Sequence, residues 1–378
     1  MMMDPHRAFE RRATLAVTTH GIARAVRGAC GVEFAPAWMN RDESVALVPE
    51  YEHEGGTGAR AGGVGVVACA RGANGEVMMR DVGPVDRSIG LGSGGGAVFE
   101  ARWSAREGEG DRCAFAGADG FLTVSRAIVE RDGCGEGEGA ISRVRFEEVD
   151  RVRCGGEGLG MATCLDWRAD GAAAVSAADG SFRTLREADT GLEVTRVFER
   201  AHDLEMWAVA FDRERVDVVY TGADDCAFKV WDTRDATRAQ ATNRSTHRAG
   251  VTCVSPSPRN ANIVATGSYD DHVRLWDVRA LKNPLSELDV GGGVWRCRWH
   301  PARDLLACAA MGAGAVLVDA TDHQSLHRTF TYDEHDSIVY GADWARLGDD
   351  APDVLVSCSF YDKSIRCWSV TDVHAHVS

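Results

Sequence analysis

Hydrophobic and polar positions alternate with a short period along Ile263 to Trp276. Ile263 to Thr266 is apolar and rich in residues that favour strands, Gly267 to Asp271 is a cluster of turn formers, and His272 to Trp276 alternates again. This pattern predicts two short antiparallel strands joined by a tight turn. Because one such hairpin cannot bury both of its faces, we expect the pattern to recur along the chain.

The Trp-Asp pair that ends this segment is typical of a WD-repeat blade. In such a blade the indole of Trp276 would donate a hydrogen bond to Thr266. The hydroxyl of Thr266 would bond His247, and the turn carboxylate of Asp270 would hold that histidine. These buried polar groups would then satisfy one another.

Seven short segments share a second pattern: an apolar residue, any residue, and then an aromatic residue or a proline. Such a triplet is typical of the innermost strand of a propeller blade. The triplets are Val32-Glu33-Phe34, Ala101-Arg102-Trp103, Leu165-Asp166-Trp167, Val209-Ala210-Phe211, Val254-Ser255-Pro256, Cys297-Arg298-Trp299 and Ala342-Asp343-Trp344.

The third residues of these triplets lie at 34, 103, 167, 211, 256, 299 and 344. The last four gaps, of 44, 45, 43 and 45 residues, fit the period of about 40 to 45 expected for one blade. The first two gaps, of 69 and 64 residues, are longer, and their excess lies in glycine-rich segments near 52–65, 90–97, 131–139 and 155–160. Since glycine clusters favour turns, these segments are predicted to be loops within blades.

The turn before the third strand also recurs. An aspartate six residues before the tryptophan position is found at Asp119, Asp179, Asp225, Asp270 and Asp362. The sixth repeat has Gly312 and Val318 in the two places, so it is predicted to lack the polar network. The candidate buried histidines are His202, His247 and His335.

Closure of the ring needs one more strand, because an open ring exposes strand edges. Arg12 to Thr19 (RATLAVTT) alternates like a strand but precedes the first repeat, so we expect it to be the outer strand of the last blade. The sequence therefore predicts an all-β, seven-bladed WD-repeat propeller over residues 12–372. Residues 1–11 and 373–378 are predicted to be flexible ends.

Composition agrees with many short strands, since 42 glycines and ten tryptophans accompany only nine prolines among 378 residues. The twelve cysteines are scattered without a CxxC pair, which favours reduced thiols in the cytosol or nucleus. The expected location is cytoplasmic. A net charge of -15 argues against a nucleic-acid partner. The first residues hold no apolar run typical of a signal peptide, and no segment reaches the length of a membrane span.

Several strings go beyond a generic WD repeat. They are AHDLEMWAVAF (201–211), YTGADDCAFKVWDTR (220–234), ATGSYDDHVRLWDVR (265–279), GGGVWRCRWHP (291–301), VYGADW (339–344) and CSFYDKSIRCW (358–368). In this order they closely resemble the diphthine methyl ester hydrolase family, which is also catalogued as diphthine methyltransferase. The resemblance is specific over roughly residues 200 to 372.

The resemblance implies a role in making diphthamide, the modified histidine of translation elongation factor 2. A methylated diphthine intermediate would lose its methyl ester by hydrolysis before the freed carboxylate is amidated. The expected partner is elongation factor 2, with other enzymes of the pathway as further candidates, and no cofactor or metal is expected.

Residues 271 and 272 are the best candidates for the chemistry. There is no Gly-x-Ser-x-Gly elbow in the chain. Asp271 and His272 follow the structural aspartate of the fifth repeat on a predicted exposed turn. An acid beside an imidazole can orient and deprotonate a water near neutral pH. The alternative is that both residues only shape the turn.

Aromatic residues point to a binding surface. Trp207, Trp295 and Tyr340 each lie four residues before the strand aromatic of their repeat, while Tyr269 and Tyr361 each precede a turn aspartate. Both sets are expected to approach one rim of the channel.

Diphthine carries a trimethylammonium group, and aromatic faces bind such cations, with Asp224, Asp271 and Asp343 as candidate sources of negative charge. The alternative for the aromatic residues is packing between blades.

Two other functions stay open. Propellers often serve as platforms, so the protein would then be a non-catalytic adaptor that presents elongation factor 2 to another enzyme. A true methyltransferase would need a cofactor-binding βαβ unit, and the sequence contains no sign of one.

Overall fold

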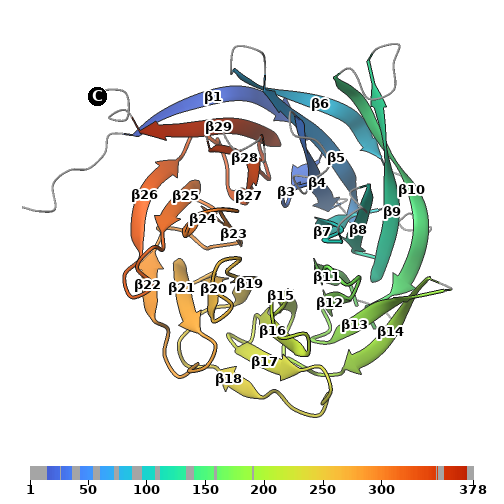
Figure 1. Cartoon of the computed structure of the whole chain (residues 1–378), viewed down its shortest axis with the longest axis vertical. Helices are drawn as coiled ribbons and strands as arrows, with labels where there is room; N and C mark the ends of the chain where they lie inside the picture. Colours follow the sequence, from blue (N-terminus) through green and yellow to red (C-terminus); the bar gives the residue numbers. More distant parts are fainter. Residues whose placement is uncertain are drawn as a thin grey trace, which may run out of the picture.

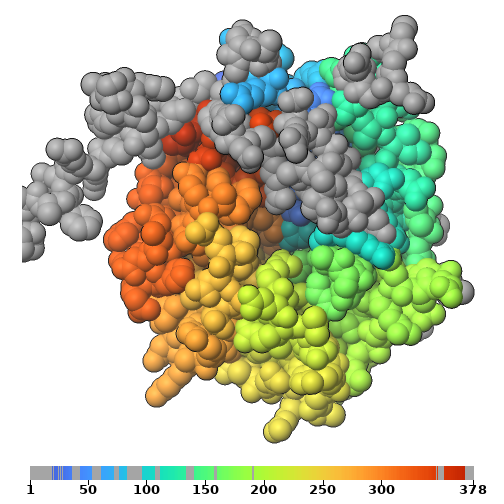
Figure 2. Space-filling model, in the orientation of Figure 1, coloured from blue at the N-terminus to red at the C-terminus, as the bar shows by residue number. Residues whose placement is uncertain are grey.

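Seven small antiparallel sheets stand in a ring around a central channel, as the computed structural model shows (Figure 1). Chain order runs around the ring, which the colours of the surface also follow (Figure 2). The structure describes residues 15–25, 27–35, 43–53, 60–71, 76–86, 96–106, 111–132, 140–156, 160–189, 191–345, 347 and 353–372. Every secondary-structure element assigned in these ranges is a β-strand, so the predicted seven-bladed all-β propeller is confirmed.

Each predicted triplet lies on the innermost strand of its blade. Blade one contains β2 (Gly28–Ala29), β3 (Glu33–Phe34), β4 (Glu43–His53), β5 (Arg60–Arg71) and β6 (Val77–Asp86). Blade two contains β7 (Val98–Trp103), β8 (Arg112–Gly117), β9 (Phe121–Arg131) and β10 (Ile141–Arg153). Blade three contains β11 (Ala162–Trp167), β12 (Ala173–Ala177), β13 (Phe182–Ala188) and β14 (Gly191–Phe198).

Blades four, five and six have shorter strands. Blade four contains β15 (Met206–Phe211), β16 (Val218–Ala223), β17 (Phe228–Asp232) and β18 (Ala241–Asn243). Blade five contains β19 (Val251–Pro256), β20 (Ile263–Ser268), β21 (His272–Asp277) and β22 (Ser286–Asp289). Blade six contains β23 (Arg296–Trp299), β24 (Leu305–Ala309), β25 (Ala315–Asp319) and β26 (His327–Tyr332).

Blade seven joins the two ends of the chain. It contains β27 (Val339–Ala345), β28 (Val354–Ser359) and β29 (Ser364–Asp372), and β1 (Leu15–Arg24) pairs antiparallel with β29 as its outer strand (Figure 1). The predicted closing strand is therefore confirmed, with a described extent of 15–24. Residues 12–14 and both predicted flexible ends, 1–11 and 373–378, lie outside the described residues.

The prediction of a loop near 52–65 was wrong for its second half, because Gly62, Gly63 and Gly65 belong to β5. A side chain at Gly62 would begin 2.0 Å from the carbonyl oxygen of Glu50 and 2.7 Å from Cα of Ala97. Glycine is needed there for close packing of backbones rather than for a turn. The excess length of the first blades lies partly in their long strands. Most of the segments 90–97 and 131–139, and half of the segment 155–160, lie outside the described residues.

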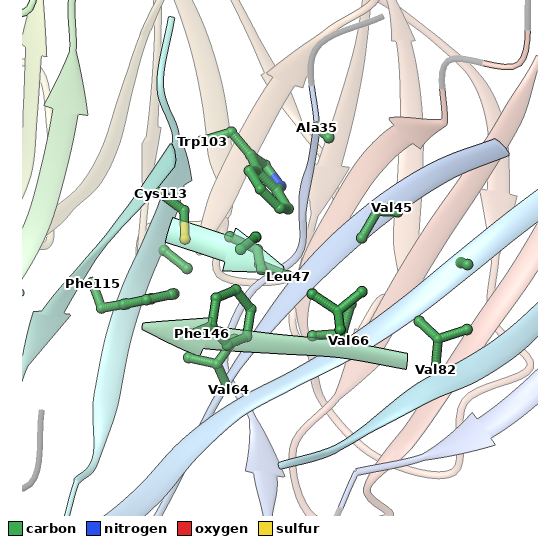
Figure 3. Packing of buried hydrophobic residues seen from close by; sticks show 14 of the residues in the cluster. Ala35, Val45, Leu47, Val64, Val66, Val82, Trp103, Cys113, Phe115 and Phe146 are labelled. Carbon is green, nitrogen blue, oxygen red and sulfur yellow. The ribbon is translucent and has the colours of Figure 1, made fainter. Parts of the chain in front are cut away.

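The core lies between neighbouring blades. Figure 3 shows one such cluster, in which Trp103 of β7, Leu47 of β4 and Val66 of β5 point into one buried layer. Phe146 of β10 packs edge-on against Phe115 of β8, with ring centroids 5.4 Å apart. Such inter-blade layers bury the sheet faces that a single blade cannot cover.

Blade four contains the complete polar network expected of the repeat. Trp231 Nε1 donates to Thr221 Oγ1 at 2.9 Å, His202 Nε2 lies 2.8 Å from the same oxygen, and His202 Nδ1 lies 2.9 Å from Asp225 Oδ1. The tryptophan, threonine and histidine are all buried. The His202 ring lowers the pKa of Asp225 to about 2, against the opposing effect of burial.

Blade five departs from this scheme, and the predicted contact between His247 and Asp270 was wrong. Trp276 and His247 both reach Thr266 Oγ1, at 2.9 and 3.0 Å. Asp270 Oδ1 instead accepts from the buried guanidinium of Arg274 at 2.9 Å. Nδ1 of His247 has no hydrogen-bond partner among the described residues, and burial lowers the pKa of this imidazole to about 3.

Blade seven inserts a serine into the network. His335 contacts Ser357 and Ser364 at 2.7 Å each, while its Nδ1 is 4.0 Å from Asp362. Trp368 Nε1 donates to Ser357 at 3.0 Å. Blade six places Val318 at the tryptophan position, as predicted.

Candidate functional site

Three large aromatic side chains meet at one end of the channel, as their shared position before the inner strands predicts. Trp207 is the second residue of β15, and Trp295 directly precedes β23. Their ring centroids are 5.5 Å apart although blade five separates the two blades. Blade five has the smaller Thr252 at the equivalent position, four residues before the strand proline. Tyr340 of β27 packs edge-on against Trp295 at 5.1 Å.

The two turn tyrosines reach this group in different ways. The ring of Tyr269 lies 5.9 Å from that of Trp295, so it joins the aromatic group directly. Tyr361 contacts Phe360, which contacts Tyr340 at 5.3 Å. Tyr269 is 37% exposed and Tyr361 is 71% exposed, so Tyr361 offers less enclosed contact to a ligand.

Sequence reasoning missed three members of the aromatic series. Phe360 and Tyr51 have ring centroids 4.9 Å apart, and Tyr51 is again 4.9 Å from Phe99. Phe360 directly precedes Tyr361, which was a usable signal. Tyr51 lies at the end of a long strand in blade one, where no repeat pattern marks it. We call Trp207, Tyr269, Trp295 and Tyr340 the rim aromatics.

Asp224 lies beside the rim aromatics. It is the residue before the structural Asp225 in blade four, and Tyr269 holds the same turn position in blade five. A side chain at Gly250 would begin 2.2 Å from Asp224 Oδ1 and 3.2 Å from Cδ2 of Tyr269, so glycine allows the two to approach. Burial, followed by the neighbouring Glu205 and Asp225 carboxylates, raises the pKa of Asp224, while the Trp207 indole opposes this rise.

One face of Trp295 is already occupied. The guanidinium carbon of Arg296 lies 4.9 Å from the centre of its ring. Arg296 is buried, and its Nη2 is 2.8 Å from Glu100 Oε2. A ligand cation would therefore meet the rim from the side of Trp207, Tyr269 and Asp224.

Asp271 lies on the turn after Tyr269, and His272 is the first residue of β21. Asp271 has φ of 67°, the left-handed conformation that Cys226 and Lys363 share at the same turn position with φ of 60° and 57°. His272 Nδ1 lies 2.7 Å from the carbonyl oxygen of Asp270. Since a carbonyl only accepts, Nδ1 donates and Nε2 is left as the basic nitrogen. Their catalytic roles stay predictions.

The channel below the rim is asymmetric. Arg298 of blade six reaches Glu33 at 2.9 Å and Glu100 at 3.3 Å, and Arg102 of blade two also pairs with Glu33. These contacts cross the ring from blade six to blades one and two. Glu33, Arg102 and Arg298, together with small residues of blades four and five, line a cavity of about 480 Å³, which we call the channel cavity.

Asp343, expected at the rim, lines this cavity instead. It is buried, and its Oδ2 accepts from the backbone N–H of Phe34 at 2.8 Å. It is therefore a link between blades seven and one. Within the described ranges, no three or more His, Cys, Asp or Glu side chains are grouped so that they would hold a metal ion. Nor do these ranges contain a helix with the length and apolar character needed to cross a membrane.

Comparison with known proteins supports both the predicted propeller fold and the family resemblance seen in the sequence. The family model described as "WD domain, G-beta repeat" matches residues 240–277 and 326–369. One chain of a solved structure titled "Crystal Structure of Mitotic Checkpoint Complex" covers 98% of this chain and 97% of its own length, with a TM-score of 0.67 and 15% identity. At that identity the likeness shows the propeller fold alone.

Several curated relatives are named for diphthine methyltransferase. "Diphthine methyltransferase homolog" from Dictyostelium discoideum is 33% identical over 228 residues, which is 55% of this chain and 62% of that protein. "Diphthine methyltransferase" from Homo sapiens is 39% identical over 153 residues, 39% of this chain and 34% of that protein. The protein of the same name from Saccharomyces cerevisiae is 32% identical over 203 residues, 46% of this chain and 51% of that protein. The chain spans less than two thirds of each of these relatives, and the resemblance expected from the sequence is confirmed.

Proposed function

We propose that this protein removes the methyl ester from methylated diphthine on translation elongation factor 2, in the cytoplasm. The similarity to proteins named diphthine methyltransferase supports action on diphthine. The observation that carries the proposal is the group of rim aromatics beside Asp224, because diphthine bears a trimethylammonium group. Aromatic faces and a carboxylate recognise such a cation, with about 0.5 to 2 kcal/mol for each aromatic contact.

Hydrolysis then needs a base for the attacking water. His272 Nε2 is the candidate, because the Nδ1 hydrogen bond to the Asp270 carbonyl fixes the tautomer. Arg248 Nη2 lies 3.4 Å from both ring nitrogens of His272. Water would add to the ester carbonyl while His272 takes its proton, and methanol would leave with a proton returned from the imidazolium.

The test is the intact mass of elongation factor 2 that carries methylated diphthine, mixed with the purified protein and no cofactor. We expect a loss of about 14 Da, the difference between a methyl ester and the free acid. A gain of about 14 Da that occurs only when a methyl donor is added would instead indicate methyl transfer, the activity named in the relatives' names. That result would overturn the proposal.

A non-catalytic adaptor is the second candidate, because His272 Nδ1 donates to the Asp270 carbonyl rather than to a carboxylate and propellers often serve as platforms. Binding of elongation factor 2 without any mass change would establish that alternative. A His272→Ala variant serves as the control in the same assay, since a contaminating esterase would act equally in both samples.

A further inference from the structure

Charge is unevenly divided between the two faces of the ring. The segments that lead into each inner strand, and the turns between the second and third strands, lie at the same end of the antiparallel blades as the rim aromatics. For blades four to seven these segments hold eleven Asp or Glu residues and four Lys or Arg residues. They are 199–205, 224–227, 244–250, 269–271, 290–295, 310–314, 333–338 and 360–363. We call this face the acidic rim.

The opposite face of the same blades has the opposite balance. Its connecting segments in blades four to six hold eight Lys or Arg residues and six Asp or Glu residues. They are 212–217, 233–240, 257–262, 278–285, 300–304 and 320–326. Negative charge is thus concentrated on the face that carries the rim aromatics, and this face attracts a cationic partner.

Ion pairs within the chain do not neutralise the acidic rim. Arg244 reaches Asp203 at 3.1 Å and Asp225 at 3.5 Å, and Lys363 lies 3.8 Å from Glu52, so two of the four cations are engaged. Six carboxylates of this face have no Lys, Arg or His nitrogen within 4.0 Å among the described residues. They are Glu199, Glu205, Asp224, Asp271, Asp333 and Asp336. Negative charge therefore remains in excess after the ion pairs of this face are counted.

Exposed apolar side chains accompany these carboxylates at two places. On the side of blade four, Leu204 is 51% exposed, and the carbonyl oxygen of the neighbouring Glu205 accepts a backbone bond of 2.9 Å from the turn of that blade. On the side of blade seven, Tyr361 is 71% exposed. The backbone N–H of Asp336 donates to the carboxylate of Asp362, next to Tyr361, at 2.9 Å. Each place combines a fixed backbone with an exposed acid and an exposed apolar group.

The rim aromatics lie between these two places. The ring of Trp295 is 5.5 Å from that of Trp207 in blade four and 5.1 Å from that of Tyr340 in blade seven. Trp295 is 5% exposed, and its indole N–H has no hydrogen-bond partner among the described residues. A buried donor calls for an acceptor, so this indole points to a ligand at the rim independently of the charges.

We propose that the acidic rim docks a basic segment of the protein substrate. The modified side chain enters among the rim aromatics, and the Lys and Arg residues that flank it in the substrate pair with Glu205 on one side and Asp336 on the other. Leu204 and Tyr361 supply apolar contact beside these pairs. The inference rests on the proposed function and adds the face that binds the substrate protein and the chemistry of the segment it binds.

Charge reversal on the two faces tests this, with the full chain and elongation factor 2 that carries methylated diphthine. Glu205→Lys and Asp336→Lys should each slow association by about 3- to 10-fold at low salt, because charges at the edge of an interface act mainly on the association rate. The difference from the wild type should shrink as NaCl rises from about 50 to about 500 mM. Stopped-flow fluorescence measures both effects.

The opposite face supplies the matched controls. Glu214→Lys makes the same change as Glu205→Lys at an exposed position of blade four, and Asp322→Lys matches Asp336→Lys in blade six. Both controls should associate within about twofold of the wild type. Melting curves check that all four variants fold, and the two rim variants change separate blades, so each tests the inference without the other.

Choline separates docking from the cation site, because it carries a trimethylammonium group without a peptide chain. Calorimetry should give Asp336→Lys the choline affinity of the wild type, although the variant associates more slowly with elongation factor 2. Equal losses of both ligands in a folded Asp336→Lys variant would overturn the docking surface.

Association of the rim variants at the rate of their controls would also overturn the inference. So would slower association in Glu205→Lys alone, because Glu205 also acts on the neighbouring Asp224. Loss of the methyl group, measured by mass, with equal association rates for all variants would leave the proposed function standing and reject only the docking surface. Charge-dependent association without a mass change would reject hydrolysis and keep the docking surface, whereas no binding of elongation factor 2 would overturn both.

Discussion

Blades four and five fold through the same hairpin, yet their turn carboxylates hold different partners. Asp225 binds His202 in blade four, whereas Asp270 binds Arg274 in blade five and leaves Nδ1 of His247 without a partner among the described residues. Both blades keep the tryptophan–threonine–histidine contacts. The buried end of the network thus defines the repeat, while the turn is free to take other partners.

The residue directly before the turn carboxylate also differs between the two blades. Blade four places Asp224 before Asp225, and blade five places Tyr269 before Asp270. Both side chains face the rim rather than the core of their blade. The hairpin supplies a fixed position, and the chemistry at that position differs from blade to blade.

The largest effect on stability should come from the tryptophan–threonine contact that the two blades share. Trp276→Ala and Trp231→Ala should each lower the free energy of unfolding by about 3 to 5 kcal/mol, because a large buried ring is lost and a buried threonine loses its donor. Chemical denaturation measures this. A midpoint for Trp276→Ala close to that of the wild type would contradict its place in the core.

Substitutions near the turn carboxylate, whose partner differs between the two blades, should destabilise blade five more than blade four. Arg274→Met should cost about 2 to 4 kcal/mol, because it leaves the Asp270 carboxylate, 4% exposed, without its cation. The matched Lys229→Met in blade four should cost about 1 kcal/mol, since the one hydrogen bond of Lys229 Nζ within the described residues goes to the carbonyl of Ala201.

Arg274→Lys is the control for this pair. It restores the blade-four pattern and frees Asp270 for His247, so it should be milder than Arg274→Met. Equal denaturation midpoints for Arg274→Met and Lys229→Met would show that Arg274 does not replace the histidine as partner of the carboxylate.

Acid should affect blade five more than blade four. The pKa of His247 is lowered to about 3, so below pH of about 6.5 the unfolded chain binds more protons than the folded chain. Stability from this group is complete above pH 6.5 and is lost as the pH falls towards about 3. We expect a loss of about 1 to 2 kcal/mol between pH 7 and pH 5.

His247→Gln should flatten this pH dependence, as denaturation at a series of pH values would show. His202→Gln should flatten it less, because Asp225 stabilises the protonated form of His202 and partly offsets the burial that lowers its pKa. A steeper dependence in His247→Gln than in the wild type would contradict the assignment.

The smallest expected effects concern ligand binding at the rim. Tyr269→Ala should weaken choline binding by about 2- to 30-fold, the range of one cation–π contact. Tyr361→Ala should weaken it less, because that ring is more exposed and lies beyond Phe360. Tyr269→Phe keeps the aromatic face and serves as control. A larger loss for Tyr361→Ala would move the cation site towards blade seven.

Much of the fold can be predicted from short segments of the sequence. The triplets, the turn aspartates and the closing strand can be read from short segments, because each blade repeats one hairpin pattern at a nearly constant spacing. The second half of the 52–65 segment was misread because Gly62 meets the backbone of the next blade, a contact between residues distant along the chain.

The site was less predictable for the same reason. Equivalent positions correctly grouped Trp207, Trp295 and Tyr340, but the position of Asp343 depends on its bond to Phe34, 309 residues away. Competition between Arg274 and His247 for Asp270 is also invisible in a repeat pattern, since both partners are compatible with it. The channel cavity depends on side chains from several blades at once, and no single segment encodes it.

The claim that one rim both binds and hydrolyses is tested most directly by the single-turnover rate and substrate affinity of two variants on methylated-diphthine elongation factor 2. His272→Ala should bind normally and react about 100- to 10,000-fold more slowly, because a base acts only as the proton moves. Tyr269→Ala should bind more weakly and react at nearly the wild-type rate once saturated. Full turnover by a folded His272→Ala variant would contradict the account.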